Sequence, residues 1–113
     1  MSINSKLDFF AVAPRLREAE VEIPGTGKTV RVRELTVGQR IEFERRAKAR
    51  TEAEIASCLL IASAIDESGA PLFTQDDEAA LNALSLNVFP PFMKALTDLN
   101  ALSAQDVEDA EKN

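Results

Sequence analysis

Apolar residues are densest between Glu54 and Asp66, in the run EIASCLLIASAID. On a helix drawn over this run, apolar side chains fall on nearly every side, which is typical of a buried helix. About a dozen residues are too few to cross a membrane, which takes about 20. Thr51 and Glu54 have the spacing of a capping box, and Gly69 offers a stop after Asp66. The pattern therefore predicts one central buried helix around which the other elements pack.

Residues 20–35 alternate apolar and polar side chains with the period of a β-strand. Val21 and Ile23 lie between glutamates, and Val30 and Val32 lie between threonine and arginine residues. The PGTGK sequence between the two halves supplies two glycines for a tight turn. The segment therefore predicts a β-hairpin with one charged face. The side chains expected to pair across that face are Glu20 and Glu22 with Arg31 and Arg33.

Three further segments have helical patterns. A capping box at Thr36 begins a helix that runs to about Arg50, through the apolar residues Val37, Ile41, Phe43 and Ala47. Thr74 caps a short helix that extends through Leu84. A last helix begins near Phe89, because prolines are tolerated in a first helical turn. Its apolar stripe, at spacings of three and four, consists of Phe89, Phe92, Met93, Leu96 and Leu99.

Together these elements predict a mainly α-helical fold. We expect a small domain of four to five helices around the central apolar helix, with one N-terminal β-hairpin. Residues 1–19 are expected to form a flexible N-terminal arm, residues 20–102 the hairpin and helical domain, and residues 103–113 an acidic C-terminal helix or tail. With 113 residues, the chain is long enough to fold without disulfides or a structural metal.

The N-terminal arm contains a clump of apolar side chains that follows neither helical nor strand spacing. Its members are Leu7, Phe9, Phe10 and Val12, and Pro14 interrupts the segment. These side chains either dock on the domain or stay exposed and engage a partner. The sequence alone leaves both interpretations open.

The composition offers no catalytic or metal site. The chain has no histidine, and its one cysteine, Cys58, lies in the predicted buried helix, where apolar surroundings raise the pKa of a thiol. Helix caps and salt pairs account for the carboxylates, so no nucleophile, base and orienting group come together. We therefore predict a protein that is not an enzyme and that binds neither a metal nor a cofactor.

The net charge of −6 is unevenly distributed along the chain. Residues 1–50 carry 11 Lys and Arg against 7 Asp and Glu, a net of +4, whereas residues 51–113 carry 2 against 12, a net of −10. The basic residues alternate with acidic ones, so the charge pattern does not predict a nucleic-acid partner. Either solvated faces or head-to-tail contact between copies, and hence a homo-oligomer, would account for the asymmetry.

The PGTGKT sequence also resembles part of the phosphate-binding loop of ATPases. The full motif requires a glycine five residues before Gly27, and that position is Glu22, whose carboxylate repels phosphate. A helix must follow the loop to hold the anion, whereas the residues after Lys28 alternate as a strand does. We therefore expect no nucleotide binding.

The order of these pieces resembles the small tail assembly chaperones of long-tailed bacteriophages and their prophage relatives. The resemblance runs from about Val21 to Asn113, through a charged hairpin closing on ELT, an apolar helix ending in DESGAPLF, an acidic-capped helix, and the closing LNALSAQDVEDAEKN. It implies a non-enzymatic, mostly helical protein that binds the tape-measure protein and keeps it soluble before tail-tube polymerisation. It also implies that this chain is the short form, with the tail-tube protein as a second partner through a longer, frameshifted form.

A chaperone for an apolar helical client needs exposed apolar side chains. The candidate partner-binding residues are Leu7, Phe9 and Phe10 of the arm, and Phe92, Met93 and Leu96 of the last helix. The alternative function is a small acidic phage or prophage adaptor or regulator that binds another protein. The start, MSINSKLDFF, lacks the basic region and long apolar run of a signal peptide, so we expect the protein in the cytoplasm of the bacterial host, with no membrane partner.

Overall fold

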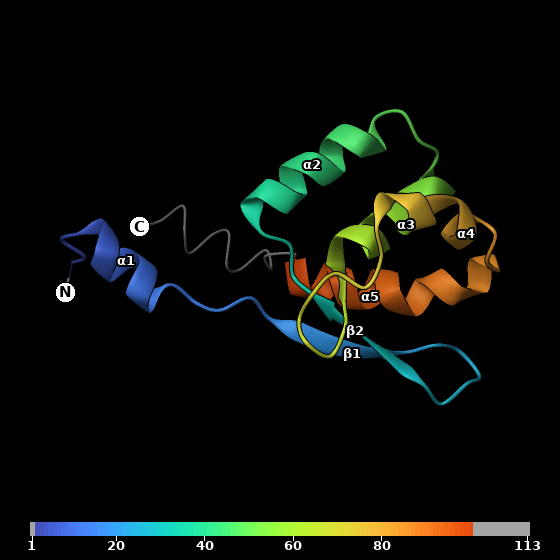
Figure 1. The fold of residues 1–113 in the computed structure, drawn as a ribbon, viewed down its shortest axis with the longest axis horizontal. Coiled ribbons are helices and arrows are strands. Elements are labelled where there is room, and N and C mark those ends of the chain that lie inside the picture. Colours follow the sequence, from blue (N-terminus) through green and yellow to red (C-terminus); the bar gives the residue numbers. More distant parts are fainter. Residues whose placement is uncertain (1, 101–113) are drawn as a thin grey trace.

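The computed structural model describes residues 2–100, and the acidic segment predicted for residues 103–113 lies outside the described residues. Its helices are α1 (Lys6–Val12), α2 (Val37–Ala47), α3 (Glu52–Ser63), α4 (Glu78–Asn82) and α5 (Phe89–Asn100). Its strands are β1 (Glu18–Glu22), β2 (Thr29–Arg33) and β3 (Ala64–Ile65). Two 3-10 turns, η1 (Gln75–Asp77) and η2 (Leu86–Val88), precede α4 and α5. Over the described residues the fold is mainly α-helical, as predicted. Figure 1 shows α5 next to the hairpin, α3 beyond α5, and α2 on the outside.

Strands β1 and β2 form the predicted antiparallel hairpin. Glu20 lies opposite Arg31, as expected, and the Arg31 guanidinium contacts the carboxylates of Glu18 and Glu20 at 3.8 and 3.7 Å. The register differs from the prediction at Glu22, which lies opposite Thr29 rather than an arginine. Charged pairs therefore fix the register over the first part of the hairpin only.

The sheet contains a third strand that the sequence analysis did not predict. The central helix ends at Ser63 rather than near Asp66, and β3 pairs antiparallel with β2, which places Ile65 opposite Arg31. The turn after β3 explains this early end, because the Asp66 carboxylate accepts hydrogen bonds from the Ser68 N–H and hydroxyl and from the Ala70 N–H. A side chain that satisfies the turn backbone competes with helix continuation.

The predicted helix starts are confirmed by their caps. Capping boxes join Thr36 to Gln39 and Thr51 to Glu54. Thr74 accepts a hydrogen bond from the Asp76 N–H at the start of η1, which leads into α4. Helix α5 begins at Phe89, with its two prolines in the first turn.

The hydrophobic core lies between the hairpin and the three helices α3, α4 and α5. Helices α3 and α5 both contribute buried residues to it, and the inward face of the hairpin closes one side. The buried residues of this core are Val21 and Val32 of the hairpin, Ala56 and Leu60 of α3, Ala64 of β3, Leu81 of α4, and Phe89, Phe92 and Leu96 of α5.

Candidate protein-binding surfaces

The arm forms a short helix, α1, where the sequence analysis expected no regular structure. The Ser5 hydroxyl accepts a hydrogen bond from the Asp8 N–H at 3.1 Å, and the Phe9 N–H donates to the Ser5 carbonyl at 3.1 Å. Ser5 and Asp8 have N-cap spacing, so the sequence did contain a start signal for this helix. The helix ends at Val12, because Ala13 precedes a proline and takes the extended conformation that this position favours.

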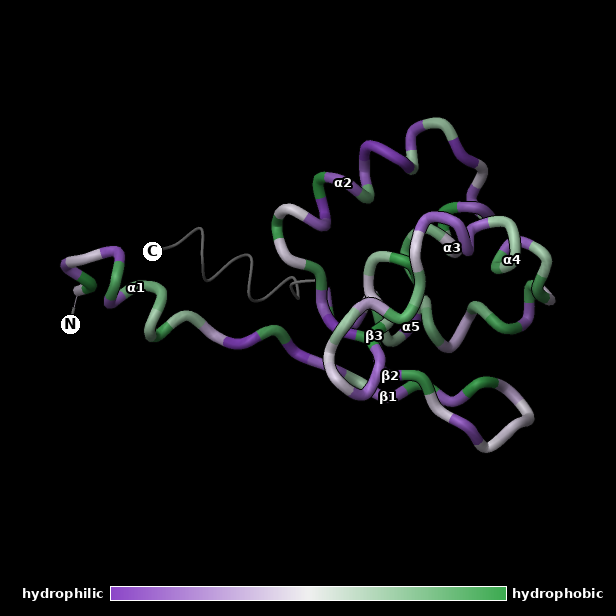
Figure 2. The backbone as a smooth tube through the Cα atoms, in the orientation of Figure 1, coloured by the Kyte–Doolittle hydropathy of each residue, from purple (hydrophilic) through white to green (hydrophobic). Residues whose placement is uncertain are grey.

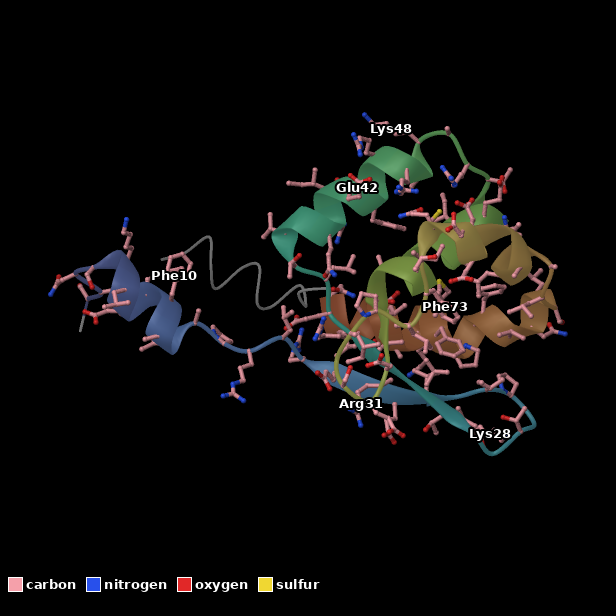
Figure 3. All side chains as sticks on the ribbon, in the orientation of Figure 1. Phe10, Lys28, Arg31, Glu42, Lys48 and Phe73 are labelled. Carbon is pink, nitrogen blue, oxygen red and sulfur yellow. The ribbon has the colours of Figure 1, made fainter. Side chains whose placement is uncertain are left out.

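The apolar side chains of α1 are exposed and do not dock on the domain. Leu7 is 77% exposed, Phe9 56% and Phe10 72%. The Phe9 and Phe10 rings contact each other edge to face, with centroids 5.5 Å apart. Figure 3 shows Phe10 far from the packed helices, at one end of the long axis. Contiguous exposed apolar surface of this kind is typical of a protein-binding segment.

Arg17, which we call the root of the arm, is hydrogen-bonded to the domain, in contrast to α1. The Arg17 N–H donates to a Glu34 carboxylate oxygen at 2.7 Å, and the Glu34 N–H donates to the Arg17 carbonyl at 2.9 Å. The Arg17 guanidinium also donates to the Leu99 carbonyl at the end of α5. These contacts fix the point at which the arm leaves the body.

The second group of predicted binding residues belongs to the core. Phe92 is 2% exposed and Leu96 1%, so the expectation that their side chains are exposed is wrong. Met93 is partly buried and packs against the same core. The physical reason is that the stripe at spacings of three and four faces α3 and the hairpin, which is the usual role of such a stripe. In this structure the arm presents the predicted apolar surface, and α5 does not.

Helix α2 has two apolar patches on nearly opposite sides. Phe43 and Ala47 are half-buried on the side that packs against α3, whereas Val37 is 80% exposed and Ile41 63%. One turn separates residues 37 and 41, so their side chains form one outward patch. The sequence predicted one helix through all four residues and did not distinguish these two faces.

A groove lies where α2 begins beside the end of α5. We call it the α2–α5 groove; it has a volume of about 300 Å³. Its apolar lining comes from Leu35, Val37, Ile41 and Leu99, and its polar lining includes Arg17, Glu34 and Arg40. The Leu35 N–H donates to the Asn100 side chain at 2.7 Å, which ties the two walls together. The groove and the arm root thus share Arg17.

A second hollow, of about 340 Å³, lies between α2, α3 and the segment before α4. Phe43, Cys58, Ile61 and Phe73 provide apolar lining. The Cys58 side chain is buried, and burial raises the pKa of its thiol. This thiol is therefore a packing group and a poor nucleophile at neutral pH.

The basic residues of α2 have carboxylate partners. Arg40 pairs with Glu44, and both Arg45 and Arg46 pair with Glu42. The Arg45 guanidinium, through its hydrogen bond, lowers the pKa of Glu42. Figure 2 shows α2 as a predominantly hydrophilic helix. Such internally paired charges are typical of a solvated face rather than a nucleic-acid surface.

The hairpin loop lacks the geometry of a phosphate-binding loop. Gly25 and Gly27 take positive φ values of 79° and 72°, and the Ile23 N–H donates to the Lys28 carbonyl at 2.8 Å. The chain then enters β2 rather than a helix, whereas a phosphate-binding loop leads directly into a helix N-terminus. Among residues 2–100, no group of three or more Cys, Asp or Glu side chains is placed to hold a metal ion. Within the same residues, no helix combines the length and apolar character needed to span a membrane.

The structure of the bacteriophage HK97 tail assembly chaperone superposes on this chain with a TM-score of 0.64 and 23% sequence identity. The match covers 87% of this chain and 96% of that one. This chain has the tail assembly chaperone fold. No protein-family model and no curated protein matches the sequence. The shared fold therefore rests on the arrangement of the elements.

Two of the exposed apolar surfaces between residues 2 and 100 are α1 and the Val37–Ile41 patch, and the sequence predicted only the first of them. Leu7, Phe9 and Phe10 were predicted as binding residues because they follow neither the helical nor the strand spacing of a packed element. Val37 and Ile41 were missed because an apolar residue in an amphipathic helix normally faces the core. The available signal was that Phe43 and Ala47 lie on the opposite side of α2, so one helix cannot bury both pairs against α3.

Proposed function

We propose that this protein is a phage tail assembly chaperone that binds the tape-measure protein and keeps it soluble before tail-tube polymerisation. The observation that carries the proposal is the fold shared with the HK97 tail assembly chaperone over nearly the whole of that chain. The exposed phenylalanines of α1 supply a surface suited to an apolar helical client. Binding without catalysis, in the cytoplasm of the host, is part of the same proposal.

The client contact is assigned to α1. Leu7, Phe9 and Phe10 are each more than half exposed, so a partner can bury most of their apolar area without unfolding the domain. Phe92 and Leu96 are excluded from direct contact in this conformation, because they are almost fully buried. The tail-tube protein remains a proposed second partner of a longer, frameshifted form.

Co-expression with the tape-measure protein tests the proposal. We expect the tape-measure protein to be soluble only when this chain is present. Replacing Leu7, Phe9 and Phe10 by serine should abolish that effect while the melting temperature stays within a few degrees, because exposed side chains contribute little to stability. The matched control replaces Leu84 and Leu86 by serine. They are 47% and 68% exposed in the segment that joins α4 to α5, at the end of the molecule opposite α1, and this variant should keep the client fully soluble. Unchanged client solubility with the wild-type chain would refute the chaperone function.

The alternative function is a small acidic adaptor or regulator that binds another phage or host protein. It predicts that tape-measure solubility is independent of this chain. A neighbouring gene for a very long, helix-rich protein favours the chaperone, and its absence favours the adaptor.

A further inference from the structure

We propose that the outer edge of β1 binds an extended segment of a partner protein in which lysine or arginine alternates with apolar residues. The sheet has the order β1-β2-β3, so β1 lies at one edge and has β2 as its only neighbouring strand among residues 2–100. The partner segment adds to this edge as a further strand. The contact is separate from the client contact proposed for α1 and does not depend on it.

Alternate residues of β1 direct their backbone groups away from β2. In an antiparallel pair, residues that exchange hydrogen bonds alternate with residues whose N–H and C=O groups point away from the neighbouring strand. The Ile23 N–H donates to the Lys28 carbonyl at 2.8 Å, and the Glu34 N–H donates to the Arg17 carbonyl at 2.9 Å. The odd-numbered residues of β1 therefore pair with β2. The even-numbered residues, whose N–H and C=O groups face the outer edge, are Glu18, Glu20 and Glu22.

These outward backbone groups are available to another strand. Within residues 2–100, no hydrogen bond from another residue reaches the backbone of Glu18, Glu20 or Glu22. Strand β1 contains no proline, and its register with β2 is continuous, so no bulge twists the edge away. An edge strand of this kind can pair with an extended segment of another protein.

The side chains along the edge select a basic partner. The Arg31 guanidinium contacts the carboxylates of Glu18 and Glu20, and Figure 3 shows Arg31 on the side of the hairpin away from the packed helices. Glu22 shares that face, because side chains alternate along a strand. A strand added to this edge lies directly beside the three glutamates, whereas the arginines of β2 lie one strand further away. Lysine or arginine at the opposed positions therefore forms favourable cross-strand pairs.

The same charges disfavour this chain itself as the occupant. Pairing β1 with β1 of a second copy places glutamates opposite glutamates, which is destabilising. Residues 101–113 carry four acidic residues and one lysine, so they are also repelled. The charge of the edge therefore favours a basic segment of a different protein.

The inner face of β1 sets the apolar half of the partner's pattern. Val21 is buried in the core and Ala19 is half-buried against it. Helix α5 packs mainly against β1, the edge strand, rather than against β2. Opposed residues of neighbouring strands lie on the same face, so alternate side chains of an added strand lie along α5. Apolar residues fit these positions, because they extend the apolar surface of the sheet.

Titration calorimetry tests the contact with a short peptide in which lysine alternates with valine as the probe. We expect the full chain to bind it about tenfold or more tightly than a peptide of the same composition with lysines and valines in two blocks. Glu22→Lys should weaken binding about fivefold or more, because Glu22 lies opposite Thr29 and its loss breaks no pair with β2. Glu52→Lys, the same charge change on α3, should not. Equal binding of the two peptides, or equal effects of the two folded variants, would overturn the proposal.

N-methylated peptides test the backbone pairing without altering the protein. Opposed residues in an antiparallel pair exchange hydrogen bonds, so methylation of the lysine N–H groups should abolish binding, whereas methylation of the valine N–H groups should preserve it. Parallel pairing reverses this order and also supports strand addition. Equal affinity of the two methylated peptides would overturn the proposal.

Hydrogen exchange measured by NMR locates the peptide on the protein. In the free chain, the amides of Ala19 and Val21 should exchange slowly because they are bonded to β2. Saturation with the alternating peptide should slow exchange about tenfold or more at Glu18, Glu20 and Glu22, whose amides face the edge. Protection confined to α1, or to no residue of β1, would overturn the proposal and leave the client contact of α1 to its own test.

Discussion

Ser57 lies in the middle of α3 with no solvent exposure, and no residue between 2 and 100 gives its hydroxyl a hydrogen bond. A buried polar group without a partner costs about 1–3 kcal/mol, and alanine also has the higher helix propensity. We therefore expect Ser57→Ala to raise the free energy of unfolding by about 1 kcal/mol, measured by urea denaturation.

Ser63, on the same helix, provides the matched control. It is 1% exposed, but its hydroxyl donates to the Leu59 carbonyl at 2.6 Å. Ser63→Ala should therefore give no gain or a small loss, because it removes a satisfied bond. Equal effects of the two substitutions would show that hydrogen bonding of Ser57 is not the cause.

At the scale of single residues, the sequence did not correctly predict which apolar side chains of the helices are exposed. Phe92 and Leu96 were assigned to a partner surface and lie in the core, whereas Val37 and Ile41 were assigned to a helix stripe and lie outside. Exposure depends on which face of a helix meets its neighbours, and that is set by tertiary packing. The local pattern of one helix does not contain this information.

At the scale of elements, the hairpin loop allows a sharp test of the phosphate-loop resemblance. The loop reverses the chain between two strands, and Figure 3 shows Lys28 at its outer tip, away from the core. Lys28→Ala should change the free energy of unfolding by no more than about 0.5 kcal/mol, as is usual for exposed surface residues. Millimolar ATP should leave the melting temperature of the wild-type protein unchanged. Micromolar ATP affinity in calorimetry would contradict this reading of the loop.

The connection between α2 and α3 is joined to α4 by a bidentate ion pair, which gives the fold an acid-sensitive contact. The Arg50 guanidinium donates to both carboxylate oxygens of Glu78, at 2.8 and 2.7 Å, and this lowers the pKa of Glu78. A lowered pKa in the folded state means that stabilisation is present above the ordinary glutamate pKa, and is lost as the pH falls through the lowered value. The melting temperature should therefore be flat from pH 8 to 5, since the chain has no histidine, and should fall below about pH 4.

Two substitutions separate this contact from general acid effects. Glu78→Gln should lower the melting temperature at pH 7 and reduce its acid dependence, because the charged pair is already lost. Asp98→Asn should do neither, because the Lys94–Asp98 pair is 3.7 Å apart and highly exposed. A full acid dependence in the Glu78→Gln variant would assign the loss of stability to other carboxylates, such as Asp66, whose pKa the Ser68 hydroxyl lowers.

Most elements were predictable because their signals are local. The caps at Thr36, Thr51 and Thr74 and the alternation of the hairpin lie within a few residues of the structure that they specify. Strand β3 was not predictable in this way, because Ala64 and Ile65 continue an apolar helical run. Their extended conformation is stabilised by pairing with β2, which is distant in sequence, and by the turn at Asp66.

At the scale of the whole molecule, α1 projects from the packed elements toward one end of a molecule that measures 50 × 30 × 25 Å overall. The proposed client contact uses this helix, none of whose residues is buried in the domain. Stability and client capture should therefore reside in different parts of the molecule, the first in the packed elements and the second in α1.

This separation gives the last prediction. Deletion of residues 1–12 should leave the melting temperature within a few degrees, because no residue of α1 is buried, and should weaken capture of a soluble fragment of the tape-measure protein in a pull-down assay. A deletion variant that unfolds would show that the arm is part of the folded domain. A folded deletion variant with unchanged capture would show that the client binds a different surface, and the hollow lined by Phe43 and Phe73 would be the next client site to test.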